Sequence, residues 1–331
     1  MFAVNYHYVR PSYDYPHGGV HGLTSEGFRS QIQTLADGWE MVHPREVVEA
    51  VETDRQPGER DCLVTFDDGL REQIEVALPI LDELGVPAVF FVNTAPIEKE
   101  IVLPVHQIHL IRATLGSEAV VDELKELIVA EGFDLADDAE YDEKARFHYS
   151  YDTPADASLK YLLNFALPFE VRDRAVDVFF KRHFDEREVS RELYMTRDHL
   201  RQLSARGLLG AHTHHHFPVG ILPEARAAEE VARCVDLLED WTGERPRFLS
   251  YPYGSREACA APASRGAARA GISAAFTMER AVNHTLQDPL RLARFDCNDV
   301  PGGKAARFSN DTPVADLPSR GWFVEEAAHA L

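Results

Sequence analysis

The chain has 331 residues, of which 45% are hydrophobic and 27% are charged, the composition of an ordinary globular protein with a sizeable core. Its 55 acidic and 34 basic side chains give a formal net charge of −21. Such a charge repels nucleic-acid phosphates and anionic membrane surfaces, so no nucleic-acid partner is expected. No stretch approaches the roughly 20 apolar residues of a membrane-spanning helix, so membrane insertion is not expected either.

The first part of the chain alternates short apolar runs with helical patterns, which is typical of an α/β fold with parallel strands. Residues 2–9 predict a strand and lack the features of a signal peptide, so we expect a cytoplasmic protein. A helix is predicted at residues 25–36, with Ser25 as its cap. An apolar strand at 62–66, a following helix and a strand at 88–92 predict a right-handed βαβ unit.

Residues 94–195 change this pattern. Helical periodicity appears at 106–115, 119–130 and 171–183, and an acidic, turn-prone run lies at 134–142. We interpret residues 94–195 as a helical insertion within a single domain that spans residues 1–331. Because long connections are uncommon unless they carry function, we expect the insertion to cap the substrate or to join copies in a homo-oligomer.

The α/β alternation then resumes and continues almost to the end of the chain. Its predicted elements are a helix at 196–206, a strand at 208–211, a helix at 223–241, a strand at 247–251, a helix at 258–270, and strands at 274–277 and 290–295. The four cysteines, Cys62, Cys234, Cys259 and Cys297, lie far apart without a CxxC pair. This spacing argues against a disulfide framework and against a structural zinc knuckle.

The first chemical motif is Thr65–Gly69, TFDDG, at the end of the 62–66 strand. Ligand sites of α/β folds gather at the carboxyl ends of strands, where one carboxylate can bind a metal while its neighbour acts as a general base. The same pair also suits the first turn of a helix, whose dipole favours acidic side chains. The motif alone leaves both interpretations open.

Two further motifs follow at later strand ends. Residues 211–218, AHTHHHFP, place His212 and His216 where one loop can bring both to a single ion; an exposed polar loop is the alternative. Residues 250–254, SYPYG, provide Tyr251, Pro252 and Tyr253 as a rigid wall for a binding cleft. The second motif favours a metal site, whereas the third is weak by itself.

The order of these motifs resembles the polysaccharide deacetylase family, also called the NodB-homology family or carbohydrate esterase family 4. The resemblance covers residues 2–91 and 196–295, and it implies a distorted (β/α)7 barrel that hydrolyses an N-acetyl amide. By this match Asp67 is the catalytic base. The implied metal ligands are Asp68, His212 and His216. The implied cofactor is one divalent cation, zinc first, with nickel, cobalt or iron as alternatives.

The chain departs from the family pattern at two places. The family motif RxPYG carries an arginine that orients the catalytic aspartate, and here Ser250 occupies that position. Arg294, at the end of a late strand, is our candidate substitute. The C-terminal LxH motif that supplies an acid histidine is absent, and the tail histidine His329 lies in an alanine-rich terminus. The N-terminal sequence YHYV resembles the branch that deacetylates poly-N-acetylglucosamine, in which a first-strand histidine is the acid; His7 fits that role, or else bonds a backbone carbonyl.

The expected substrate is an N-acetylated sugar or sugar-containing metabolite. A small non-carbohydrate amide, as in allantoinase-like or formamidase-like relatives, is an alternative with the same chemistry. A catalytically silent carbohydrate-binding homologue is a second alternative, although the retained aspartate pair argues against it. A non-haem iron oxygenase also uses two histidines and a carboxylate, but its ligands are expected on a β-sandwich, and this chain is predicted to be α/β.

Overall fold

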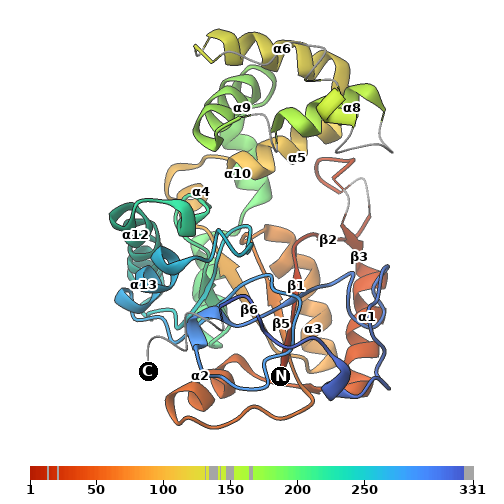
Figure 1. Ribbon diagram of the computed structural model, residues 1–331, viewed down its shortest axis with the longest axis vertical. Coiled ribbons are helices and arrows are strands. Elements are labelled where there is room, and N and C mark those ends of the chain that lie inside the picture. Colours follow the sequence, from red (N-terminus) through yellow and green to blue (C-terminus); the bar gives the residue numbers. More distant parts are fainter. Residues whose placement is uncertain are drawn as a thin grey trace. The chain divides into compact units, whose positions relative to one another are not determined.

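The computed structural model describes residues 1–12, 15–20, 22–130, 132–133, 141, 143–146, 153–163 and 167–323. The chain divides into two compact units (Figure 1). Unit 1 consists of Met1–Ser12, Gly22–Lys99 and Leu193–Leu331, and unit 2 consists of Tyr13–His21 and Glu100–Glu192. Among the described residues, no helix is both long and apolar enough to cross a membrane.

Unit 1 is built on parallel strands that follow one another in the order β10-β1-β5-β6-β7-β8-β9. The strands are β1 (Phe2–Tyr6), β5 (Asp61–Phe66), β6 (Ala88–Val92), β7 (Leu209–Ala211), β8 (Phe248–Ser250), β9 (Ala274–Phe276) and β10 (Phe295–Asp296). Just before β10, Leu292 pairs in parallel with Phe276 of β9, and its backbone N–H donates to the carbonyl of Ala275 at 2.8 Å. The sheet therefore curls into the predicted distorted (β/α)7 barrel.

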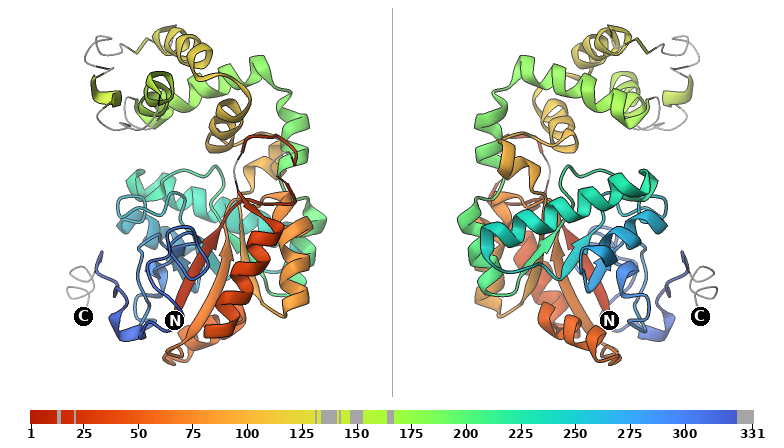
Figure 2. Two further views of the ribbon diagram at one scale, coloured as in Figure 1. Left: turned by 90° about the vertical axis from the view of Figure 1, so that its right-hand side faces the viewer. Right: turned by 90° about the vertical axis from the view of Figure 1, so that its left-hand side faces the viewer.

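Helices enclose the strands of unit 1, as Figure 2 shows. They are α1 (Ser25–Gly38), α2 (Pro44–Glu52), α3 (Leu78–Leu84), α4 (Ala95–Lys99), α11 (Arg197–Ala205), α12 (Glu224–Thr242) and α13 (Ala261–Arg269). Tyr6, Phe66 and Phe90 alternate with inward residues and stack on one another's rings, and Phe28 of α1 meets Tyr6 edge-on at 5.1 Å. These aromatic contacts fill the space between strands and helix.

The barrel interior has an apolar floor and a polar upper layer. The floor belongs to one buried cluster, whose strand members include Ala3, Leu63, Val89, Phe91, Phe248, Ala274 and Phe276. Because successive strand residues point to opposite faces, Asn5 and Thr65 face the same side as Ala3 and Leu63, one step nearer the carboxyl ends. The polar layer therefore lies at the end of the barrel where ligand sites of such folds gather.

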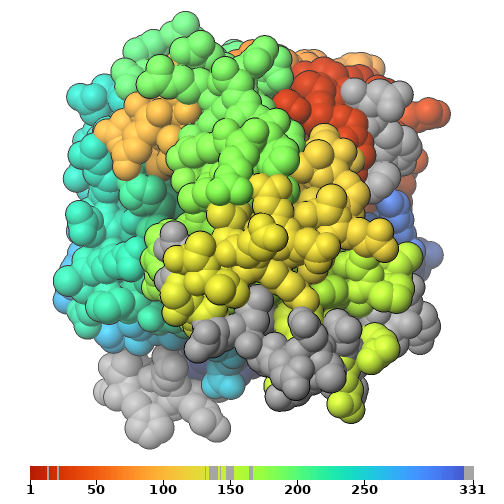
Figure 3. Space-filling model, turned by 90° about the horizontal axis from the view of Figure 1, so that it is seen from above, coloured from red at the N-terminus to blue at the C-terminus, as the bar shows by residue number. Residues whose placement is uncertain are grey.

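Unit 2 is helical. Its elements are α5 (Pro104–Thr114), α6 (Ser117–Ala130), α8 (Pro154–Tyr161), α9 (Phe169–His183) and α10 (Glu186–Leu193), which runs one residue into unit 1. Helix α9 packs on α5 and α6 and buries Ala175, Val176, Phe179 and Phe180. Figure 3 shows one face of these helices in space-filling form, yellow to light green. Most of the acidic run 134–142 lies outside the described residues, and so does His329.

Several predicted bounds were wrong. The first strand ends at Tyr6, because Val9–Arg10 leave β1 and pair with Leu23–Thr24 as β2 and β3. Thr24, not Ser25, caps α1, because its hydroxyl accepts from the N–H of Gly27. Pro289–Arg291 form a 3-10 turn instead of the start of a strand.

Candidate active site

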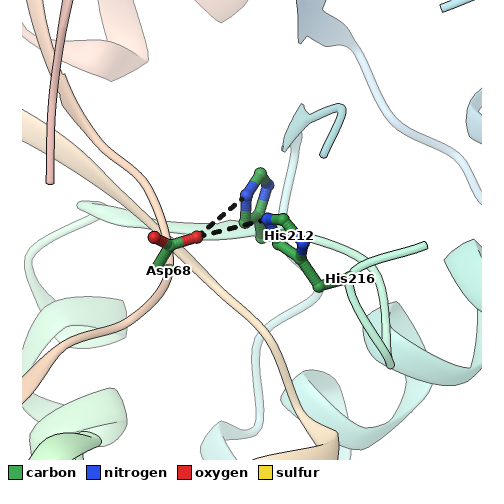
Figure 4. A group of neighbouring side chains, drawn as sticks. All are labelled: Asp68, His212 and His216. Atoms are coloured by element: carbon green, nitrogen blue, oxygen red, sulfur yellow. Dashed lines mark ion pairs between the residues drawn. The ribbon is translucent and has the colours of Figure 1, made fainter. Parts of the chain in front are cut away.

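Three side chains from two strand ends converge at the carboxyl end of the barrel. Asp68 follows β5, His212 follows β7 directly, and His216 lies four residues further along the same loop. The carboxylate Oδ1 of Asp68 is 3.4 Å from Nε2 of each histidine (Figure 4). One donor atom from each of the three buried residues lies within 4.8 Å of the others. The donors are of the type and number that a zinc-like ion takes from a protein.

The surroundings of His212 prepare it to bind a cation. Its Nδ1 lies 2.7 Å from the backbone carbonyl oxygen of Ser250, so Nδ1 carries the proton and Nε2 faces Asp68. Burial lowers the pKa of His212, but the carboxylates of Asp67 and Asp68 outweigh burial, and the pKa lies above its ordinary value. A pocket that stabilises a proton here also stabilises a metal cation, so the donor set fits a metal.

The site is also where backbone strain concentrates. Asp68, Thr213, His216 and Tyr253 all have positive φ angles, of 81°, 62°, 61° and 62°. Each non-glycine residue in this region costs on the order of 1 kcal/mol or more, and such residues persist where the surrounding contacts hold them. The positive φ angles in the turns after β5, β7 and β8 therefore lower the stability of the fold, and they set the directions in which these side chains point.

The loop that carries the histidines is held from behind. The side-chain amide of Asn93 donates to the carbonyls of His212 and Thr213. Glu230, on α12, accepts from the backbone N–H of His215 at 2.9 Å, and its other oxygen lies 2.8 Å from His215 Nδ1. His214 lies 2.7 Å from the hydroxyl of Thr94. His214 and His215 therefore fix the loop, while His212 and His216 face Asp68.

Asp67 is buried beside this triad. Arg294 donates two hydrogen bonds to its carboxylate, Nη1 to Oδ1 at 2.9 Å and Nη2 to Oδ2 at 2.8 Å, and Asn5 donates a third to Oδ2 at 3.0 Å. Burial raises the pKa of Asp67, but Arg294 and His212 outweigh it and lower the pKa to about 2. The carboxylate is therefore ionised at neutral pH, the form in which it accepts a proton.

Arg294 lies at the centre of the polar layer and is fully buried. Besides Asp67, its guanidinium donates to the carbonyl of Thr277 and to the side chains of Asn5, Thr65 and Ser250, the last at 2.7 Å. These partners come from strands on different sides of the barrel, so the arginine crosses its interior. Ser250, at the position where the family resemblance expects an arginine, supplies a hydroxyl acceptor to Arg294 instead.

The other predicted residues occupy different positions. His7 is half-buried after β1, and its charge is one of the influences that lower the pKa of Asp67. Tyr251 is buried and donates its hydroxyl to the carbonyl of Leu290 at 2.8 Å. Pro252 is buried, whereas Tyr253 is 45% exposed and its ring centre lies 5.1 Å from that of His216. Of the aromatic wall, Tyr253 is the residue open to a ligand.

Sequence reasoning did not select Asn5, Thr65 or Glu230. Asn5 left a signal, because it is the one strongly polar residue in the apolar run FAVNY. A buried amide in such a strand needs hydrogen-bond partners, and a strand next to the aspartate motif makes that motif the natural partner. Glu230 left none, because an acidic residue on an acidic helix is usually solvated.

The family profile described as polysaccharide deacetylase matches residues 54–137 and 177–274, more than half of the chain. Among solved structures, the chain is similar to the Streptococcus pyogenes deacetylase PplD in complex with acetate, at 14% identity and a TM-score of 0.53, covering 89% of this chain and 91% of that one. It is also similar to IcaB from Ammonifex degensii, at 20% identity and a TM-score of 0.53, covering 89% and 90%.

A third similar structure is the de-N-acetylase from Aggregatibacter actinomycetemcomitans, at 15% identity and a TM-score of 0.51, covering 94% of this chain and 95% of that one. At these identities the likeness concerns the fold. Comparison with curated proteins gives no significant match.

Proposed function

The chain belongs to the polysaccharide deacetylase family and is a hydrolytic N-deacetylase, and we propose that it uses one divalent cation to remove the acetyl group from an N-acetylated sugar or sugar-containing metabolite. One observation carries this proposal. A donor set of Asp68, His212 and His216, suited to a cation, lies directly beside Asp67, an ionised carboxylate that makes no part of that set.

Asp68, His212 and His216 would hold the cation, zinc first and nickel, cobalt or iron as alternatives. When bound, such a cation polarises the acetyl carbonyl and lowers the pKa of a coordinated water from about 16 towards roughly 7. A hydrogen bond on the far side of the His212 ring supports this role. The bond between His212 Nδ1 and the Ser250 carbonyl fixes the ring in the orientation that a metal ligand needs.

Asp67 is proposed as the general base that takes the proton from the attacking water. Arg294 and Asn5 hold its carboxylate in one orientation, which supports the role because proton transfer depends first on geometry. His7 is proposed as the general acid that protonates the leaving amine. Its position after β1, within electrostatic reach of Asp67, supports this assignment.

The proposed substrate is small, a single N-acetyl sugar or a sugar-bearing metabolite in the cytoplasm. Tyr253 supports a sugar ligand, because an exposed aromatic ring beside a metal ligand offers a flat apolar face to a pyranose. Pro252 would stiffen the same wall, and Tyr251 would support it from within. The cytoplasmic location is supported by four cysteines that are free thiols.

Two measurements test the proposal together. The first is the metal content of purified protein after reconstitution, where one equivalent is expected and less than about one-tenth contradicts a three-ligand site. The second is hydrolysis of N-acetylglucosamine derivatives, measured as acetate release, and of small cyclic or formyl amides, measured as ring opening or formate release. Turnover of the amides alone would favour the allantoinase-like alternative, and metal binding with no turnover at all would favour a silent carbohydrate-binding homologue.

A further inference from the structure

Strands β1 and β5 separate at the point where the proposed acid and base begin. Their parallel pairing ends at Tyr6 and Phe66, and the last bond between them runs from the N–H of Asp67 to the carbonyl of Tyr6 at 3.0 Å. Beyond this point the chain from His7 turns towards β2. The next carbonyls of both strands thus lose the partners that a continued ladder would supply.

Gln73 provides those partners. Its side-chain Nε2 donates to the carbonyl of His7 at 3.0 Å and to the carbonyl of Asp67 at 2.5 Å. Its side chain is fully buried. A single amide group thereby joins the two backbone positions from which the proposed general acid and general base project.

The helix that carries Gln73 is unusual at this residue. Gln73–Ala77 form a π-helical turn, closed by a bond from the N–H of Leu78 to the carbonyl of Gln73, before α3 continues as a regular helix. Such turns are rare, and they are frequently found at functional sites.

Gln73 also carries a buried acceptor that no described residue uses. Its Oε1 is buried without a hydrogen-bond partner within the described part of the chain, which costs about 1–3 kcal/mol relative to a satisfied acceptor. A methionine of similar length would fill the same space without that acceptor, but it would leave the two carbonyls without their donor. What the amide contributes is therefore the two bonds that Nε2 donates.

We propose that Gln73 is a positioning residue that sets the separation between His7 and Asp67 in the deacetylation reaction. The inference rests on the proposed roles of these two residues, and it assigns Gln73 no contact with substrate. Its effect falls mainly on proton delivery to the leaving group. The side chain of Asp67 is already held by Arg294 and Asn5, whereas the backbone carbonyl of His7 is held by the bond from Gln73.

The leaving group separates this role from a structural one. An amine leaves an amide only with a proton delivered to it, whereas 4-nitrophenolate leaves an acetyl ester without one. Misplacing the acid therefore slows amide hydrolysis and spares ester hydrolysis. Partial unfolding or loss of the metal slows both reactions equally.

The experiment compares Gln73→Met with Gln31→Met on an N-acetyl amide and on 4-nitrophenyl acetate. Gln31 is a matched control: it is a buried glutamine bonded to the Tyr6 hydroxyl of the same strand, away from the site. For Gln73→Met we expect kcat on the amide to fall by about 10- to 100-fold, because small displacements of catalytic groups have effects of this size. We expect an ester rate near that of the parent, unchanged metal content and an unchanged KM.

Equal losses on both substrates, or no loss on either, would overturn the inference. If the Gln73→Met protein does not fold, Gln73→Leu is the second variant to be measured. His7→Ala is measured in parallel: if its losses do not depend on the leaving group, the acid of the proposed function is wrong. A selective loss in His7→Ala without one in Gln73→Met leaves that function intact and refutes the positioning role alone.

Discussion

At the residue scale, the barrel places a charge pair where a buried pair does little for stability. Asp67 and Arg294 are both buried, and the desolvation of two charges generally offsets most of their attraction. A hydrophobic pair of similar volume would serve the fold as well. The bidentate contact nevertheless keeps a carboxylate ionised beside the proposed metal ligands, which is what the proposed role of Asp67 as general base requires.

The first prediction concerns Asp67→Asn. An amide keeps the shape of the side chain but cannot accept the water proton, so we expect the metal content of the parent and a rate lower by about 10²-fold or more. Acetate release and metal analysis on the same preparation measure this. Asp61→Asn, at the opposite end of β5, is the control and should keep its activity. An active Asp67→Asn enzyme would show that Asp67 serves only the fold, as the partner of Arg294 and Asn5.

The second prediction is energetic coupling between Arg294 and Asp67. Arg294→Met leaves a buried carboxylate without its cation, which destabilises a protein by about 3–5 kcal/mol. Adding Asp67→Asn removes that stranded charge, so the double variant should be more stable than the sum of the single effects predicts. Urea unfolding of the metal-free proteins measures the free energy of unfolding of the parent, the two single variants and the double variant. Additive effects would mean that the two side chains do not share a charge interaction.

Much of the site was predictable at this scale. His212 and His216 were candidates because histidines clustered at a strand end have few structural uses, and the family resemblance added Asp68. The structure brings donor atoms of all three together. Arg294 was predicted because Ser250 stands where the family motif has an arginine, so another cation was expected beside Asp67. Asn5 and Gln73 were not reached, because a lone amide has no characteristic partner until the packing of the strands is known.

At the element scale, the histidine loop is held by a helix that contributes no donor to the proposed metal site. Glu230 on α12 binds both the backbone N–H and the ring of His215, and His215 lies in the loop between His212 and His216. Burial raises the pKa of Glu230, but its bonds to His215 outweigh this effect, and the pKa lies below its ordinary value. The carboxylate is thus available as an acceptor at neutral pH.

The third prediction follows from this contact. Glu230→Ala should weaken metal affinity by about 10- to 100-fold, the usual effect of removing a residue that orients ligands. Glu229→Ala, its exposed neighbour on the same helix, should leave the affinity unchanged. Titration with a competing chelator measures both. Equal affinities in the two variants would mean that the loop holds its shape without α12.

The periodicity of the sequence predicted the longer helices and strands correctly, but it did not predict the short ones. Strands β5 and β6 and helix α12 lie within a residue or so of their predicted bounds, because each has an apolar pattern and a clear end, such as Gly243 after α12. The two-residue strands β2, β3 and β10 exist only through their pairing partners, which local sequence does not reveal. The turn Pro289–Arg291 stands in place of the start of the strand predicted at 290–295 for the same reason.

At the scale of the whole molecule, unit 2 is joined to unit 1 at two places in the chain. One connection follows β2 and returns at Gly22, and the other follows α4, which comes after β6, and returns at Leu193. The first departure comes after β1 and β2, and the second comes after β6 and α4. Both therefore come after the carboxyl end of a barrel strand, β1 or β6, at the end of the barrel from which Asp68 and His212 project. Loops at these ends determine substrate choice in barrel enzymes.

The fourth prediction is that unit 2 restricts the substrate to small molecules. Replacing residues 100–192 with a short glycine-rich linker should leave metal content unchanged, because the three ligands all belong to unit 1. Hydrolysis of polymeric N-acetylglucosamine should rise relative to that of the monosaccharide, because the variant lacks the segment to which this prediction assigns the selection of small substrates. Acetate release from both substrates measures the ratio.

The measurement also separates a cap from an oligomerisation arm. If residues 100–192 join two copies, their removal converts a dimer to a monomer in light scattering and leaves the ratio of polymer to monosaccharide hydrolysis as it was. If they select substrate, the ratio changes whatever the oligomeric state. A folded, metal-bound truncated protein could also keep both its oligomeric state and its ratio of polymer to monosaccharide hydrolysis. That result would contradict both roles, and unit 2 would then serve neither substrate selection nor assembly.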